Sequence, residues 1–346
     1  MNTSVKSPFG TTARSSVLRG AAVAVLSAGI ALASGSGAVL AQTTMNLGWG
    51  TPLDSNNGVF AKKFAELVDS YTNGEVEVKL RPSGQISSED DAFKALQLGT
   101  VDSYLISQNN ISPHFGMMDV FVLPYVFRSR DHAIAVLDGE VGSFIQERLF
   151  EQTGVHLLSF NNVEHRDLYN SVRPIETFED FGGLKYRVPK NEVMIETFRA
   201  FGAEPVPLAW SETPTALQTG TIDGGDNGTS VILDMKFYEF ADNLAILEHF
   251  SGFTPLLVSD RFMSRIDEEQ AEALRRAALE AQDHQRTVMK DEIQKVRDAL
   301  AGHGMQVTYP EKAPFIEAAE SVQNKFADEK GEDFRNLLVR IRETEG

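Results

Sequence analysis

Strand-like and helix-like segments alternate along the chain, and this alternation restricts its fold more than any other feature of the sequence. Residues 45–49, 76–80 and 101–106 are short runs with the apolar patterning of strands. Residues 58–70 and 90–98, which lie between them, have apolar side chains at helical spacing. This order of elements favours helices packed on a largely parallel sheet. The sequence therefore predicts an α/β fold.

A second series of the same kind begins near Val155. Strands are expected at 184–188 and near Val206, with a helix over 192–201 between them. The chain has 346 residues, and single hydrophobic cores stop growing at about 250–300 residues. Two domains are therefore expected.

The C-terminal part predicts one long helix. The chain contains neither glycine nor proline from Asp267 to about Ala301, and Asp267 with Gln270 forms a capping box at the start. At about 1.5 Å per residue, this helix would be roughly 50 Å long. It either packs on the edge of one domain or runs across both, and the sequence leaves both interpretations open.

The first 41 residues have the pattern of a secretory signal peptide. They lack Asp and Glu but contain Lys6, Arg14 and Arg19, followed by an apolar run over 21–32 and small residues ending at Ala41. The run is shorter than the ~20 residues that a membrane span needs. We expect cleavage after Ala41, export to a bacterial periplasm, and no direct membrane insertion once the signal is removed.

Composition and missing motifs exclude several classes of function. The formal net charge of −17 makes nucleic acid an improbable partner, and the absence of cysteine excludes disulfides, thiolate metal sites and thiol nucleophiles. The sequence contains no nucleophile elbow, phosphate-binding glycine loop or zinc-protease motif. We therefore expect no cofactor, no metal and no enzymatic activity. A remote alternative is a secreted lyase or hydrolase that uses carboxylates such as Glu212 and Asp223.

Six short motifs, taken in their order and spacing, are typical of one protein family. They are RPSGQI at 81–86, LGTVD at 98–102, LPYVF at 123–127, GLKYRVP at 183–189, FGAEP at 201–205 and ALQTGTIDG at 216–224. With these motifs, the chain resembles the solute-binding proteins of tripartite ATP-independent periplasmic (TRAP) transporters. The resemblance extends over nearly all of the chain after the signal peptide.

The resemblance implies a two-lobed periplasmic binding protein fold built from discontinuous segments. Residues 42–164 with 252–291 would form lobe I, and residues 165–251 with 292–346 would form lobe II. The long C-terminal helix would span both lobes. Closure of two such lobes around a ligand is a recurring device of binding proteins.

Arg187 is the main candidate for a ligand contact. It lies on the expected strand 184–188, just before Pro189, where its guanidinium would present a planar set of N–H donors that matches a carboxylate. From the residues alone, Arg187 either meets a ligand, lies at the surface, or pairs with an internal Asp or Glu. The resemblance implies the first, because in this family the strand arginine clamps the carboxylate of the ligand.

The resemblance implies ligand contacts at four further positions. Arg166 matches a second arginine of the family, and Asn227 matches a ligand-binding asparagine. Trp210 matches an aromatic position that packs on the ligand, although a core tryptophan would also fit the sequence. Glu89 falls where family members place an acidic contact, and it would equally suit the first turn of a helix.

Strand ends supply the remaining candidates. Ligands of open α/β sheets bind beyond the carboxyl ends of strands. Ser107, Gln108 and Asn109 follow the expected strand 101–106, and Thr51 follows the strand 45–49 with Asp54 close behind it. These side chains are expected to line the same crevice as Arg187.

The sequence thus predicts a periplasmic protein that captures a small organic acid and passes it to the membrane subunits of a TRAP transporter. A dicarboxylate, a keto or hydroxy acid and a sugar acid all suit an arginine clamp. Glu89, Trp210 and Glu212 would instead suit a sulfonate or a zwitterion such as ectoine. The sequence does not choose among these ligands.

Overall fold

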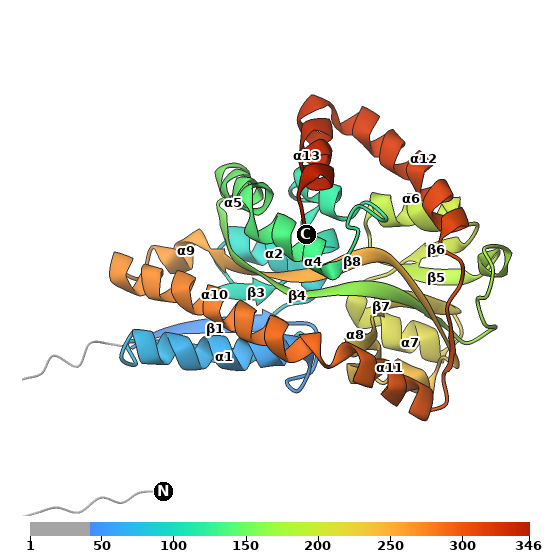
Figure 1. Cartoon of the computed structure of the whole chain (residues 1–346). Coiled ribbons are helices and arrows are strands. Elements are labelled where there is room, and N and C mark those ends of the chain that lie inside the picture. Colours follow the sequence, from blue (N-terminus) through green and yellow to red (C-terminus); the bar gives the residue numbers. More distant parts are fainter. Residues whose placement is uncertain (1–41) are drawn as a thin grey trace, which may run out of the picture. The chain divides into compact units, whose positions relative to one another are not determined.

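The computed structural model describes residues 42–346, so the signal peptide expected at residues 1–41 lies outside the described residues. The first strands and helices occur in the predicted order (Figure 1). They are β1 (Thr43–Trp49), α1 (Asn56–Tyr71), β2 (Val76–Arg81), α2 (Glu89–Gln97) and β3 (Ser103–Leu105). β1 lies between β2 and β3 and is parallel to both.

Serine caps start the first two long helices. The Ser55 side chain accepts a hydrogen bond from the Gly58 N–H at the start of α1, and Ser88 does the same for Asp91 in α2. Both caps satisfy backbone donors that have no partner inside the helix. They also define where the loops after β1 and β2 end, and these loops border the site described below.

Two long antiparallel strands run through the middle of the molecule, side by side in Figure 1. β4 (Val155–Asn170) has 16 residues and β8 (Asn243–Ser259) has 17. The sheet order is β2-β1-β3-β8-β4-β7-β5-β6, and the short β9 (Gln306–Thr308) also pairs with β8.

The expectation of a largely parallel sheet is therefore wrong for the centre of the sheet. β8 is antiparallel to β3 and β4, and β4 is antiparallel to β7. Polar side chains such as Asn161, Glu164 and Arg166 interrupt β4 at its middle although they are buried. The sequence of β4 consequently resembles neither the alternating pattern of a half-buried strand nor the continuous apolar run of a buried one.

The paired strands bend near their midpoints. The register of β4 against β8 shifts between Asn161 and Glu164 and again between Arg166 and Leu168. Asn162 and Glu248 both have a φ of 56° there. Such bulges bend a strand and increase its twist. The bend separates the part of the ladder beside β3 from the part beside β7.

The second series forms the other end of the sheet. It consists of β5 (Lys185–Val188), α6 (Glu192–Ala200), β6 (Glu204–Pro207), α7 (Thr213–Gln218), β7 (Gly224–Gly228) and α8 (Thr229–Asp234). β5 lies between β6 and β7 and is parallel to both. This part agrees with the parallel arrangement predicted from the sequence.

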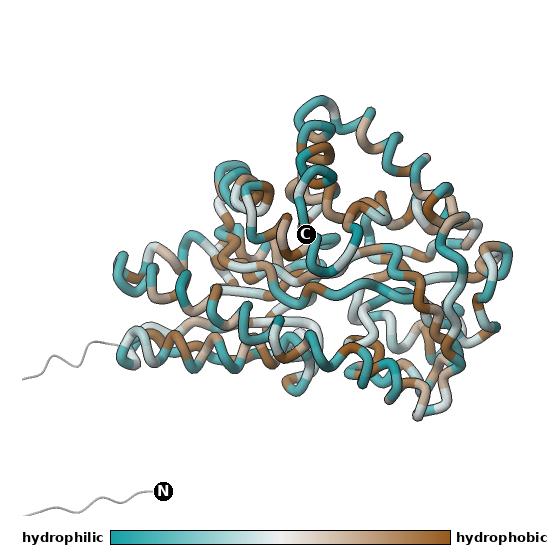
Figure 2. Tube along the Cα trace, in the orientation of Figure 1, coloured by the Kyte–Doolittle hydropathy of each residue, from teal (hydrophilic) through white to brown (hydrophobic). Residues whose placement is uncertain are grey.

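The remaining helices cover the sheet and close the chain. They are α3 (Gln108–Ile111), α4 (Arg130–Asp138), α5 (Glu140–Thr153), α9 (Asp260–Met263), α12 (Ala313–Lys330) and α13 (Glu332–Glu343). α12 packs on α6, whereas α13 packs on α5 and on the short helix Gly116–Phe121. Figure 2 shows teal and brown alternating along these helices, as expected for helices with one buried side.

The single long helix expected after Asp267 is two helices. α10 (Glu268–Lys290) and α11 (Ile293–Gly302) are separated at Asp291 and Glu292, and the predicted capping box of Asp267 and Gln270 is present. No glycine or proline breaks the helix there. The interruption instead follows the packing, because α10 lies on α1 and β4 whereas α11 lies on α8. Together the two helices contact both ends of the sheet.

Buried apolar side chains within residues 42–346 form three clusters. One joins β1, α1 and α10, with Leu47, Phe64 and Leu274 among its members. Another surrounds α7, α8 and α11 at the far end of the sheet and includes Ile232 and Leu300. The third and largest cluster contains residues from both ends of the sheet. The two ends thus have their own cores and also share one.

None of the helices within residues 42–346 combines the length and the hydrophobicity that crossing a membrane requires.

Candidate functional site

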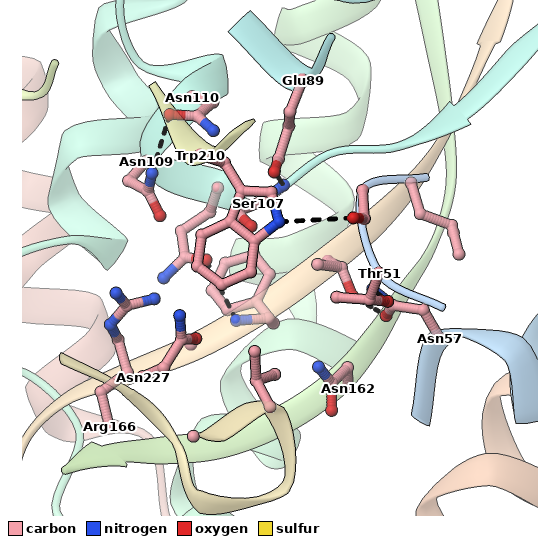
Figure 3. Close-up of a pocket in the computed structure, with 18 of the residues that line it drawn as sticks. Thr51, Asn57, Glu89, Ser107, Asn109, Asn110, Asn162, Arg166, Trp210 and Asn227 are labelled. Carbon is pink, nitrogen blue, oxygen red and sulfur yellow. Dashed lines mark hydrogen bonds between the residues drawn. The ribbon is translucent and has the colours of Figure 1, made fainter. Parts of the chain in front are cut away.

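One pocket gathers nine of the residues that the sequence predicted as ligand contacts. Arg187, Arg166, Asn227, Trp210, Glu89, Ser107, Gln108, Asn109 and Thr51 all line it. Its walls come from the ends of β1 and β3, the start of α1, and β5, β7 and the middle of β4 and β8 (Figure 3). Asp54 is the exception among the crevice candidates, because it is exposed and pairs with Lys62.

Several lining residues were not predicted from the sequence. These are Asn57, Asn110, Asn162, Glu164, Val231 and Thr254, together with glycines and apolar neighbours. Asn57 follows β1 closely, so the strand-end rule that indicated Thr51 could have found it. Asn162 and Glu164 lie at the bulge of β4, and no local pattern indicated a bulge there.

Arg166 is held by an internal acid. Its Nε and Nη2 atoms lie 2.6 and 3.0 Å from the two carboxylate oxygens of Asp226, and Nη2 also donates to the Asp226 carbonyl oxygen at 2.7 Å. Burial alone would raise the pKa of the Asp226 carboxyl, but the Arg166 guanidinium, together with the His249 imidazole, outweighs burial and keeps this pKa well below its usual range. The charge of Arg166 is therefore compensated within the protein.

Arg187 has no such acid in the part of the chain that the structure describes. Its Nε and Nη2 atoms both donate to the Leu208 carbonyl oxygen, at 3.1 and 2.9 Å, and its side chain is buried. Within residues 42–346, no carboxylate lies within ion-pair distance of Arg187. Burial lowers the pKa of this guanidinium. The interpretation of Arg187 as the partner of an internal Asp or Glu is therefore wrong, and that description applies to Arg166.

The Leu208 contact orients the Arg187 guanidinium. Because one edge of the plane is fixed on a backbone carbonyl, the edge formed by Nη1 and Nη2 keeps N–H donors for another acceptor. No hydrogen bond among residues 42–346 uses Nη1. This edge has the geometry that a carboxylate accepts in two parallel bonds.

Glu89 presents one carboxylate oxygen to the pocket. Its Oε1 accepts a hydrogen bond from the Ser107 N–H at 2.6 Å, which joins the start of α2 to the residue that precedes α3. No bond within the described part of the chain engages Oε2. One oxygen of Glu89 therefore holds the backbone at Ser107, and the other can accept a hydrogen bond from a ligand.

The amide side chains divide into engaged and free groups. Gln108 donates to the Ser251 carbonyl oxygen and accepts from the Phe253 N–H, so both ends of its amide are used to hold β8. Asn57 bonds Thr51 and Thr254 in the same way. The amide of Asn227, by contrast, bonds no other residue of the 42–346 range, and Figure 3 shows it near Arg166.

Trp210 extends across the pocket. Its Nε1–H donates to the Gly50 carbonyl oxygen at 3.4 Å, the bond drawn from the indole in Figure 3. The ring lies 5.6 Å from the Arg187 guanidinium and meets Phe237 edge-on at 5.9 Å. Trp210 is thus partly buried between Phe237 and Arg187 on one side and the loop after β1 on the other.

The carboxylates suggested for a secreted lyase or hydrolase do not form a site. Glu212 accepts a hydrogen bond from the Ala209 N–H and Asp223 accepts one from the Lys185 N–H, and neither lines the pocket. No group of three or more His, Asp and Glu side chains in residues 42–346 is arranged to hold a metal ion.

A polar pocket with a buried arginine lies between the two ends of the sheet. These features define a solute-binding protein. The model of the family "bacterial extracellular solute-binding protein, family 7" matches residues 48–330. The chain belongs to this family of TRAP solute-binding proteins, and its fold is the two-lobed periplasmic binding protein fold. Because the family and its structural relatives are binding proteins, the enzymatic alternative does not apply.

Similar proteins bind organic acids. The 2,3-diketo-L-gulonate-binding periplasmic protein YiaO of Escherichia coli K12 is 30% identical over 93% of this chain and 94% of its own length. A TRAP solute-binding protein from Polaromonas sp. JS666, bound to D-erythronate, is 29% identical with a TM-score of 0.84, over 88% of this chain and 100% of that one. One from Roseobacter denitrificans, with β-D-glucuronate, is 28% identical with a TM-score of 0.83, over 87% and 100%.

Proposed function

We propose that the chain captures a hydroxylated monocarboxylate, of the sugar-acid class, in the periplasm and delivers it to the membrane subunits of a TRAP transporter. The observation that carries this proposal is the buried Arg187 guanidinium, which has no carboxylate partner within residues 42–346. A buried charge is costly unless it is paired. The carboxylate of the ligand would supply the missing partner at the Nη1 and Nη2 edge.

The neighbouring charges favour a single carboxylate on the ligand. Arg166 is already neutralised by Asp226, so it adds little attraction for a second anionic group. Glu89 lies in the same pocket with a free oxygen and would repel a second carboxylate. A hydroxyl group, in contrast, can donate to Glu89.

The free amides also suit hydroxyl groups. The Asn227 amide provides a donor and an acceptor, and a hydroxyl both donates and accepts. The D-erythronate and glucuronate bound by two structural relatives and the 2,3-diketo-L-gulonate named for the Escherichia coli relative combine one carboxylate with several oxygen functions. These ligands agree with the chemistry of the pocket.

Delivery would depend on two lobes that close on the ligand. We propose residues 42–164 with 252–291 as lobe I and 165–251 with 292–346 as lobe II. The irregularities of β4 at residues 161–168 and of β8 at residues 245–254 lie at this boundary and would act as the hinge. The contact of α13 with α5 means that the C-terminal helices also connect the lobes.

A ligand panel tests this function. The protein beginning at Gln42 would be titrated calorimetrically with D-glucuronate, D-galacturonate, D-erythronate, succinate, taurine and ectoine. We expect at least one sugar acid to bind more tightly than the other three compounds. At a hundredfold excess over its dissociation constant, that ligand would stabilise the fold by about 2.7 kcal/mol. Tighter binding of succinate, taurine or ectoine would replace the proposed ligand class with that compound's class.

A further inference from the structure

The loop after β1 and the segment after β6 meet across the pocket at a single glycine. Gly50 and Trp210 are 160 residues apart, and the indole N–H donates to the Gly50 carbonyl oxygen. A Cβ atom added at Gly50 would lie 3.0 Å from Cδ1 and 3.3 Å from Nε1 of Trp210. Gly50 does not have a positive φ, so its backbone conformation does not require glycine. A side chain at this position would therefore require the indole to move by a few tenths of an ångström.

The indole is held from its own side of the pocket. Phe237 meets the ring edge-on at 5.9 Å, and the Arg187 guanidinium lies over it at 5.6 Å. The cation and the ring attract each other, more strongly when water is excluded. Trp210 therefore contacts both the residue proposed to bind the ligand carboxylate and the backbone of the opposite lobe.

A second contact joins the same two lobes beside the pocket. The Asn56 N–H, at the start of α1, donates to the Asp234 carboxylate at the end of α8, with a distance of 3.3 Å. This bond and the Trp210 contact belong to the same arrangement of the lobes. Both would be lost if the two sides of the pocket moved apart at the bulges of β4 and β8.

We propose that Trp210 and Gly50 form a latch that stabilises the closed arrangement of the lobes, with Gly50 as a positioning residue that makes room for the indole. This inference rests on the two lobes of the proposed function. The latch couples ligand capture to closure because Trp210 lies against Arg187 on one side and Gly50 on the other. Glu89, whose Oε2 lies 3.5 Å from the same Cβ position, borders the contact.

The two tryptophans of the chain allow a test that needs no ligand. Replacing the buried Trp49 by phenylalanine leaves Trp210 as the sole tryptophan. In this Trp49→Phe background, we expect Gly50→Ala to shift Trp210 emission to longer wavelength and to increase its quenching by acrylamide. Gly302→Ala is the matched control, because nothing lies within 4 Å of its Cβ position and its φ is not positive. Unchanged quenching in Gly50→Ala would overturn the latch.

Rescue separates a latch from general damage to the fold. With D-glucuronate, or the panel's tightest sugar acid, as probe, Gly50→Ala should bind roughly tenfold or more weakly, as expected for an overpacked contact. Trp210→Phe in the same chain should recover part of that loss, because the smaller ring leaves space for the methyl group. Melting curves without ligand should stay close to the parent. If Trp210→Phe recovers none of the lost affinity, the latch is overturned. If the parent protein binds none of the sugar acids, the proposed function is rejected, and the fluorescence result alone decides whether the latch exists.

Discussion

Substitution of Arg187 by lysine gives the most informative test of the site. Two nitrogens of the guanidinium hold the Leu208 carbonyl oxygen, and the edge formed by Nη1 and Nη2 faces the proposed carboxylate. Lysine keeps the positive charge but has a compact ammonium group, which cannot make two parallel bonds while also holding Leu208. The variant should therefore bind the ligand poorly although it folds normally.

The expected loss follows from the burial of the pair. Arg187 is only 4% exposed, so its interaction with a ligand carboxylate would be largely shielded from water. Disrupting one partner of such a charged, hydrogen-bonded pair costs about 2–5 kcal/mol, which corresponds to a thirtyfold to several-thousandfold loss of affinity. The variant also loses the two hydrogen bonds to the Leu208 carbonyl oxygen. Because this oxygen is neutral, that loss should lower the stability of the fold less than the loss of the carboxylate contact lowers the affinity for the ligand.

The assay combines calorimetric titration with a melting curve of the same variant. The titrant is the sugar acid that binds the parent protein most tightly. Arg199→Lys serves as the control, because Arg199 is exposed and forms its ion pair with Glu196 on its own helix. Near-parent affinity in Arg187→Lys would remove Arg187 from the site and, with it, the main reason to expect a carboxylate. A lower melting temperature with unchanged affinity would assign Arg187 a structural role.

Two further predictions concern stability and processing. Burial raises the pKa of the Asp167 carboxyl to about 7, although Arg297 lies 3.1 Å away. In the unfolded chain the pKa of this carboxyl would be about 3.9. Between these two pKa values, Asp167 is protonated in the folded protein and ionised in the unfolded chain. Its contribution to stability is therefore complete at low pH and lost as pH rises through about 7. Urea unfolding at pH 5 and pH 8 should show that Asp167→Asn reduces this decline, and an identical decline in the variant would contradict the assignment. The exported protein should begin at Gln42 or within a few residues of it, and N-terminal sequencing that finds residues 1–20 retained would refute the signal peptide.

Local patterns were sufficient for the elements near the ends of the sheet. β1, β2 and β5 lie within a residue or two of the predicted ranges, and the Asp267–Gln270 capping box is present. In each case the signal is contained in a few consecutive residues, such as an apolar run, a cap or a helical spacing. The strand-end rule likewise indicated Thr51, Ser107 and Asn109 as neighbours of one crevice, because parallel strands bring their carboxyl ends to the same edge.

Longer-range features required the folded chain. The mixed centre of the sheet depends on β4 pairing with β8 about ninety residues away, for example Arg166 with Phe250, and no local spacing contains that information. The division of α10 from α11 follows from their different neighbours. In both cases the decisive contacts are between residues distant in sequence.

The roles of the polar residues were decided by the tertiary structure alone. The family resemblance predicted Arg166, Arg187 and Glu89, and the strand-end rule predicted Gln108, as neighbours in one crevice, and all four line the same pocket. Only the fold pairs Arg166 with Asp226, uses both ends of Gln108 to hold β8, and leaves Arg187 without an acid among residues 42–346. The physical reason is that residue type and spacing specify which donors and acceptors are available, whereas the packing of distant strands decides which of them are already satisfied.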